Sequence, residues 1–207
     1  MKKEFLRSIK RFWYFLWNDD SWFGWIFSIA FLFLFAKFLF FPLLGFITGT
    51  TLPLAIVESC SMFHNEGITF SFDSWWENRE RYYSDFSISR EDFSNFWLKN
   101  GFNKGDILLI IRANPKKLDV GDIIVFSAPT KNPVIHRIVE INEEGGKRIF
   151  STFGDNNNGQ ISFEKEITEE QIIGKPLLKV APYFGWVKLV FFERFRSSNE
   201  RGLCHRN

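Results

Sequence analysis

The chain has 207 residues and a formal net charge of +2, so it can hold one domain with a small appendage, and its charge gives no indication of nucleic-acid binding. Aromatic residues make up 19% of the chain, which is more than a soluble core of this size needs and is typical of proteins that contact lipid. The two cysteines exclude a disulfide framework and a cysteine metal site, and leave open whether Cys60 and Cys204 pair.

Residues 1–20 are predicted to form a basic amphipathic segment. Apolar and aromatic side chains recur at helical spacing between five basic residues, namely Lys2, Lys3, Arg7, Lys10 and Arg11. One basic face and one apolar face are typical of a helix that lies in a membrane surface.

Residues 21–47 are predicted to form a transmembrane anchor. The chain is apolar from Trp22 to Phe46 except for Lys37, and this run of roughly 25 residues is long enough to cross a bilayer. It is too long for the apolar core of a signal peptide, so we expect it to be retained. Lys37 would either snorkel toward the outer interface or mark the end of the span.

The charges around the anchor predict its orientation. The five basic residues precede the span, and none follows Lys37 until Arg79. The positive-inside bias therefore places the N-terminus in the cytosol and the remainder of this single-pass protein on the outer or lumenal side of a cell or endoplasmic-reticulum membrane.

Residues 48–195 are predicted to form an extracytoplasmic β-rich domain. The apolar run 52–57 reads as a short strand that leads into Ser59-Cys60-Ser61-Met62. Residues 63–101 are rich in aromatic and charged side chains, and we expect one or two inserted helices there. Ser74 is a candidate N-cap, and Ser89 with Asp92 has the spacing of a capping box. We expect the aromatic side chains of this insertion to pack on the domain.

The pattern changes to strands after Asn103. Short apolar or alternating runs are separated by turn residues, at 105–111, 120–126, 134–141, 147–152 and 172–180. Such strands without βαβ spacing predict a mainly β fold, with an antiparallel sheet or a barrel-like β-domain. Residues 183–195 would form a terminal helix that touches the membrane, and residues 196–207 a flexible tail.

Three chemical elements follow the anchor in order. They are the Ser59–Met62 motif, a lone histidine at His136 in an alternating strand, and Gly154-Asp155-Asn156-Asn157. A serine hydroxyl is a poor nucleophile unless a base takes its proton, and His136 is a candidate base. The order and spacing of these elements resemble signal peptidase I, in the archaeal and endoplasmic-reticulum branch where histidine replaces the lysine base. The resemblance covers most of the chain.

The resemblance implies a role for each site residue. Ser61, directly before the methionine, would be the nucleophile, and the Ser59 hydroxyl would stabilise the oxyanion together with the Ser61 N–H. His136 would be the general base, and Asp155 would orient its imidazole. Ile161 stands where the family often has a second aspartate, so Glu164 is a further candidate for acidic support.

Two further positions depart from the family pattern. Cys60 stands where a glycine is usual between the two serines, and His64 stands where a proline is usual. His64 is a rival base. It is only three residues from Ser61 on the same local chain, however, and a residue on a facing strand is better placed to act as the base.

The resemblance implies a membrane-bound serine endopeptidase that removes signal peptides from exported precursor proteins, with no metal or organic cofactor. Its partners would be these precursors and the lipid bilayer, with the export machinery as a further candidate, and no nucleic acid. Three alternatives remain: a non-catalytic peptide-binding module of the same fold, a peptidase that uses Cys60 as its nucleophile, and a self-cleaving repressor-type peptidase with a Ser–Lys pair. The anchor and His136 argue against the last.

Overall fold

The computed structural model describes residues 2–64 and 72–204, and the chain divides into two compact units, Met1–Ile47 and Thr48–Asn207. The first unit is helical. It contains α1 (Lys2–Asn18) and a longer helix built from α2 (Trp22–Phe35), the π-helical turn η1 (Ala36–Phe40) and α3 (Phe41–Thr48). The Ser21 hydroxyl caps α2 by accepting a hydrogen bond from the Gly24 N–H at 3.0 Å.

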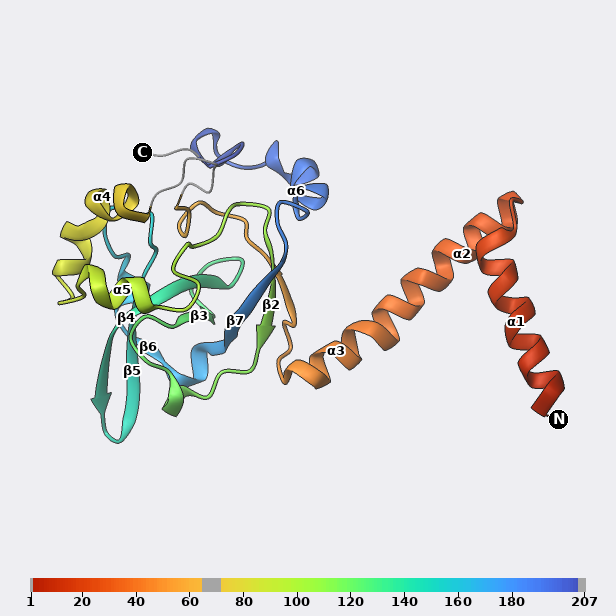
Figure 1. Cartoon of the computed structure of the whole chain (residues 1–207), viewed down its shortest axis with the longest axis horizontal. Coiled ribbons are helices and arrows are strands. Elements are labelled where there is room, and N and C mark those ends of the chain that lie inside the picture. The colour runs from red at the N-terminus through yellow and green to blue at the C-terminus, as the bar shows by residue number, and fades with distance from the viewer. Residues whose placement is uncertain (1, 65–71, 205–207) are drawn as a thin grey trace. The chain divides into compact units, whose positions relative to one another are not determined.

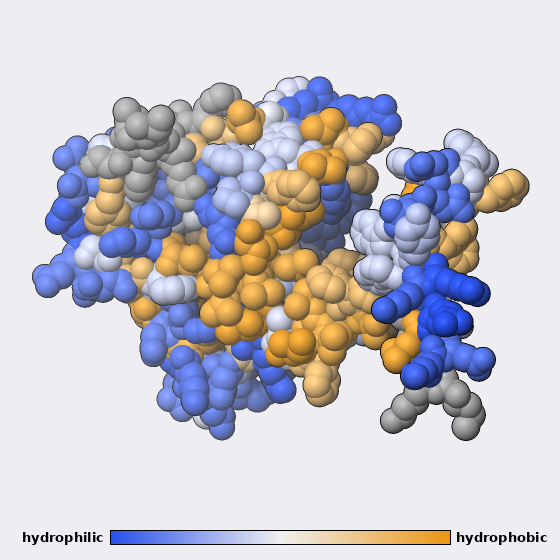
Figure 2. Space-filling view, turned by 45° about the vertical axis from the view of Figure 1, so that its right-hand side comes forward, coloured by the Kyte–Doolittle hydropathy of each residue, from blue (hydrophilic) through white to orange (hydrophobic). Residues whose placement is uncertain are grey.

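The segment Trp22–Thr48 is a candidate membrane span of 27 residues. Its length and apolar composition meet the requirement for crossing a bilayer, as the sequence predicted. Lys37 lies in the π-helical turn, and its ammonium group lies over the rings of Phe33 and Phe38. Figure 2 shows hydrophobic side chains gathered over much of the visible surface, between patches of hydrophilic ones.

The second unit is built on a seven-stranded antiparallel sheet with the strand order β1-β2-β7-β3-β4-β5-β6 (Figure 1). Its strands are β1 (Leu54–Ile56), β2 (Ile107–Ile111), β3 (Ile123–Phe126), β4 (Val134–Glu144), β5 (Lys147–Phe153), β6 (Ile167–Thr168) and β7 (Ile172–Ala181). This confirms the predicted fold class, although the two-residue β6 was not expected. Short 3₁₀ turns lie at Pro115–Lys117, Ser162–Glu164, Glu169–Gln171 and Ser198–Glu200.

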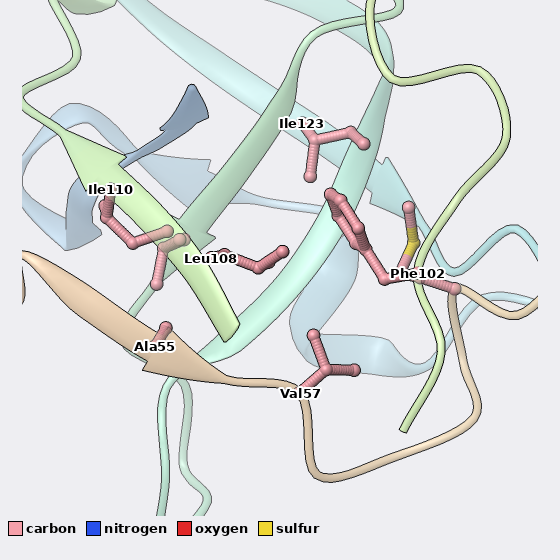
Figure 3. Close-up of a cluster of buried hydrophobic side chains, with 8 residues drawn as sticks. Ala55, Val57, Phe102, Leu108, Ile110 and Ile123 are labelled. Carbon is pink, nitrogen blue, oxygen red and sulfur yellow. The ribbon is translucent and has the colours of Figure 1, made fainter. Parts of the chain in front are cut away.

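One core cluster lies where the first strands of the sheet meet. Leu108 and Ile110 are fully buried on β2, because alternate side chains of a strand point to the same face. Figure 3 shows them gathered with Ala55 of β1 and Ile123 of β3. Val57, Met62 and Phe102 belong to the same cluster, so the core reaches the backbone on both sides of the two serines.

The insertion contains α4 (Phe72–Ser84) and α5 (Arg90–Asn95), which pack on the β4–β5 side of the sheet. Their buried aromatic side chains form a second cluster with Val139 of β4 and Phe153 of β5. The expected capping box of Ser89 and Asp92 is present at the start of α5. The expectation that Ser74 caps a helix was wrong, because Ser74 lies inside α4.

The chain ends in α6 (Trp186–Glu193), followed by an irregular segment. Several large apolar side chains on β7 and α6 are exposed, among them Leu178, Val180, Val187, Val190 and Phe191. They belong to none of the three clusters of buried hydrophobic residues.

The core contribution can be measured with a matched pair of leucines. Leu108→Ala removes a fully buried side chain and leaves a cavity, so we expect the free energy of unfolding to fall by about 2–5 kcal/mol. Leu178→Ala, on β7 and 40% exposed, should cost less than about 1 kcal/mol. Denaturant unfolding of both variants in detergent tests this. An equal decrease in the free energy of unfolding for the two variants would contradict the assignment of Leu108, and not Leu178, to the core.

Candidate functional site

The two serines lie in a loop that follows β1. The loop begins where Val57 exchanges backbone hydrogen bonds with Asp106 and Gly105, at 2.9 and 2.8 Å. It ends where the Met62 carbonyl accepts a hydrogen bond from the Phe102 N–H at 2.7 Å. The Ser59 and Ser61 hydroxyl oxygens are 3.0 Å apart, so the loop presents two adjacent hydroxyls between two fixed ends.

His136 lies on β4, paired with Ile124 of β3, and is 4% exposed. Its Nδ1 contacts Oε1 of Glu164, whose side chain is fully buried. The second carboxylate oxygen of Glu164 accepts a hydrogen bond from the Ile161 N–H at 2.6 Å. Glu164 is therefore the acidic neighbour of the imidazole in this structure.

Asp155 lies in a different set of contacts from the one expected. Its carboxylate accepts hydrogen bonds from Arg137 Nη2 at 2.7 Å and from the Tyr83 hydroxyl at 2.6 Å. It also lies 2.8 Å from His64 Nε2. The resemblance implied that Asp155 orients His136, whereas in this structure the carboxylate in contact with the His136 imidazole is that of Glu164. His136 and Arg137 are neighbours on a strand, so their side chains point to opposite faces and reach different carboxylates.

Burial alone would raise the pKa of Asp155, but the Arg137 charge and the hydrogen bonds from His64 and Arg137 hold this pKa well below its usual range. Burial lowers the pKa of His64, and the contact with Asp155 offsets only part of this effect. Burial, followed by the neighbouring Asp155 charge, raises the pKa of Tyr83. The stable arrangement at neutral pH is therefore an ionised Asp155–Arg137 pair beside a neutral His64.

His64, the rival base, is 1% exposed and its ring stacks on Trp75 with the centroids 3.8 Å apart. It is thus part of the aromatic cluster that covers Asp155. The loop that contains Ser61 and the strand that contains His136 come together outside this aromatic cluster.

They meet at the turn that follows β5. Phe153 pairs with Arg137, so the next residue, Gly154, lies beside His136, and a Cβ at Gly154 would be 2.9 Å from His136 Nε2. Two residues later, the Asn156 N–H donates to the Ser61 carbonyl at 2.7 Å. Two residues of chain span at most about 7 Å, so Nε2 and the Ser61 backbone contact the same short turn.

Cys60 and Cys204 form a disulfide with their Cα atoms 5.5 Å apart. The side chain between the two serines is therefore bonded to the C-terminal segment. Arg196 also donates to the Glu58 carbonyl at 3.0 Å and to its carboxylate at 2.7 Å. Residues 196–207 were expected to form a flexible tail. Of these, the structure describes residues 196–204, and these contacts attach that part to the serine loop.

No role was predicted for three residues that the structure brings to the site. Arg137 was passed over because it reads as an ordinary polar strand residue, although its position next to His136 could have suggested a second, oppositely directed ion pair. Arg79 and Asn156 contact one another across 77 residues, and no local pattern predicts such a contact. Among residues 2–64 and 72–204, no cluster of three or more His, Cys, Asp and Glu side chains is arranged to hold a metal ion.

Comparison with known proteins gives several partial matches. The chain is 40% identical over 57 residues to signal peptidase I W of Bacillus subtilis, covering 27% of this chain and 30% of that protein. It is 29% identical over 103 residues to the signal peptidase complex catalytic subunit of Metarhizium robertsii, covering 46% and 59%. A catalytic subunit from Canis lupus familiaris is 27% identical over 104 residues, covering 45% and 52%.

The chain thus spans less than two thirds of the length of each of these relatives. No protein-family model matches it. The matches confirm the resemblance to signal peptidase I that the order of the sequence motifs indicated.

The buried His64 predicts a pH-dependent stability. Its folded-state pKa is lowered, so as the pH falls below about 6.5 the unfolded chain takes up a proton that the folded chain does not. The free energy of unfolding should therefore decrease from pH 7 to pH 5. His64→Gln keeps an N–H donor for Asp155 without titrating, and it should flatten this slope by up to about 1.4 kcal/mol per pH unit.

Denaturant unfolding in detergent at pH 5, 6 and 7 measures the two slopes. Asp155 titrates outside this window, since its unfolded-state pKa is about 3.9 and its folded-state pKa is lower still. His136→Gln is the matched control because it leaves His64 in place. Equal slopes for wild type and His64→Gln would contradict the prediction.

Proposed function

We propose that this chain, a relative of the signal peptidases, is a membrane-anchored serine endopeptidase that removes signal peptides from exported precursor proteins. The observation that carries the proposal is the meeting of two elements at one turn: the buried His136–Glu164 pair and the loop with the two serine hydroxyls. Gly154 contacts the first and Asn156 the second.

His136 is the general base in the proposed mechanism. Its Nε2 takes the proton of the Ser61 hydroxyl as Oγ attacks the scissile carbonyl. Glu164 holds Nδ1–H, which fixes the tautomer and stabilises the imidazolium that forms. The imidazolium then protonates the leaving amine, the mature protein departs, and water activated by His136 releases the signal peptide from the acyl-enzyme.

The Ser59 hydroxyl and the Ser61 N–H are the proposed oxyanion donors. Negative charge develops on the carbonyl oxygen only as the tetrahedral intermediate forms, so donors aimed at that position favour the transition state over the ground state. The 3.0 Å separation of the two hydroxyl oxygens supports this pairing, since a carbonyl attacked by Ser61 would lie within reach of Ser59.

β1 is an edge strand of the sheet and leads directly into the serine loop. An extended precursor segment would add to this edge by backbone hydrogen bonding, with small side chains one and three residues before the cut, as in the Ala-x-Ala pattern of signal peptides. The candidate span would keep the site near the bilayer in which the signal segment lies, and the export machinery is a further candidate partner.

The proposed orientation places the second unit outside the cytosol. The basic residues of α1 precede the span, and the Cys60–Cys204 disulfide is typical of an oxidising compartment. The disulfide also argues against Cys60 as the nucleophile, because its sulfur is already bonded to that of Cys204.

The decisive test is cleavage of a signal-peptide precursor in liposomes by wild type, Ser61→Ala and His136→Ala. Wild type should cut after an Ala-x-Ala site, and each variant should lose at least about 1,000-fold in kcat while remaining folded. Activity that survives in Ser61→Ala would remove this residue as the nucleophile. A folded wild type that cuts none of several precursors would favour the non-catalytic peptide-binding module.

A second test separates the two acids. Glu164→Gln should lower kcat by about 100- to 10,000-fold with little effect on stability to denaturant, because the imidazole loses its charged partner. Asp155→Asn should instead lower the free energy of unfolding by about 3–5 kcal/mol, because it leaves the buried Arg137 charge without its partner. The reverse pattern would make Asp155 the orienting acid.

A further inference from the structure

The helical insertion contacts the turn after β5 through a buried arginine. Arg79 of α4 is 6% exposed and donates three hydrogen bonds to the turn after β5: to the Asn157 carbonyl at 3.0 Å, to Asn158 Oδ1 at 3.3 Å and to Asn156 Oδ1 at 2.6 Å. Removing a guanidinium from water is unfavourable unless its N–H groups are bonded, so these acceptors determine where the side chain lies.

The Asn156 side chain links Arg79 to Cys60 by one hydrogen bond to each. A guanidinium can only donate, so the amide atom that faces Arg79 must be the oxygen. The amide nitrogen then faces the Cys60 carbonyl, to which it donates at 3.0 Å. Without Arg79 the amide oxygen would lose this donor, and the Asn156 side chain would be held at the Cys60 carbonyl by a single hydrogen bond.

The Cys60 carbonyl belongs to the same peptide plane as the Ser61 N–H. In a planar trans peptide these two groups point in opposite directions, so fixing one fixes the other. The Asn156 N–H holds the next carbonyl, that of Ser61, at 2.7 Å. Within the described part of the chain no acceptor is bonded to the Ser61 N–H, which leaves this donor free for a ligand.

We propose that Arg79 and Asn156 are positioning residues for the oxyanion hole: through the Cys60 carbonyl they aim the Ser61 N–H at the developing negative charge. This inference rests on the proposed peptidase function. It gives the insertion a part in the reaction, because α4 supplies the arginine that fixes the amide of Asn156.

The chain offers a matched control on the same helix. Arg79→Met removes the guanidinium from the turn, whereas Arg81→Met removes an exposed one that contacts the neighbouring Tyr82. In precursor cleavage we expect Arg79→Met to lower kcat by about 10- to 100-fold with KM changed less than about threefold, because an oxyanion donor acts in the transition state. Arg81→Met should stay within about twofold of wild type.

Asn156→Asp provides the second variant. It retains the acceptor for Arg79 and replaces the donor to Cys60 with a carboxylate oxygen. We therefore expect kcat to fall at least as much as the about 10- to 100-fold expected for Arg79→Met. This variant keeps the inference testable if Arg79→Met does not fold. Arg79→Lys keeps a cationic donor and should recover part of the activity. A directly structural readout is the amide NMR resonance of Ser61 in detergent micelles, which should shift in Arg79→Met and Asn156→Asp and stay unchanged in Arg81→Met.

The outcomes separate this inference from the function on which it rests. If wild type cleaves, Ser61→Ala does not, and folded Arg79→Met and Asn156→Asp match Arg81→Met in kcat, the positioning role is overturned and the peptidase stands. A raised KM with unchanged kcat would also overturn it, by making the pair a substrate-binding contact. If wild type does not cleave, the peptidase proposal fails and this inference falls with it.

Discussion

The site depends on the register between β4 and β5. Arg137 pairs with Phe153, so the two residues that follow Phe153 meet the two adjacent side chains of β4 on opposite faces. Gly154 lies against the His136 ring, where a larger residue would collide, and Asp155 binds Arg137 on the other face. A shift of one residue would exchange the faces and bring a carboxylate to the wrong partner.

The buried Asp155–Arg137 pair is compatible with folding because its remaining hydrogen-bonding capacity is filled. Tyr83 and His64 bond the carboxylate, and the aromatic cluster of the insertion excludes water around them. Breaking one partner of such a pair is far more unfavourable than the pair itself is stabilising. The pair therefore joins the insertion, through Tyr83, to β4 of the sheet.

The mainly β fold, the apolar span and most strand positions could be predicted from the sequence, because hydrophobic periodicity and turn residues are local signals. The partners of the site residues could not. Glu164 reaches His136 from a 3₁₀ turn whose position depends on the path of the chain after β5, and the motif suggested Asp155 first. The Cys60–Cys204 pairing spans 144 residues and has no local signature.

The cysteine in place of the usual glycine illustrates how such a departure is accommodated. A glycine is required only where φ is positive or a neighbour approaches closely, and among the described non-glycine residues positive φ occurs at Ser87, Leu98 and Tyr183 only. Cys60 therefore holds the loop without backbone strain, and its side chain is free to bond the C-terminal segment. The serine loop is held from three sides, by the segment 102–106 that precedes β2, by the turn after β5 and by this disulfide, so its backbone is fixed at both ends and between them.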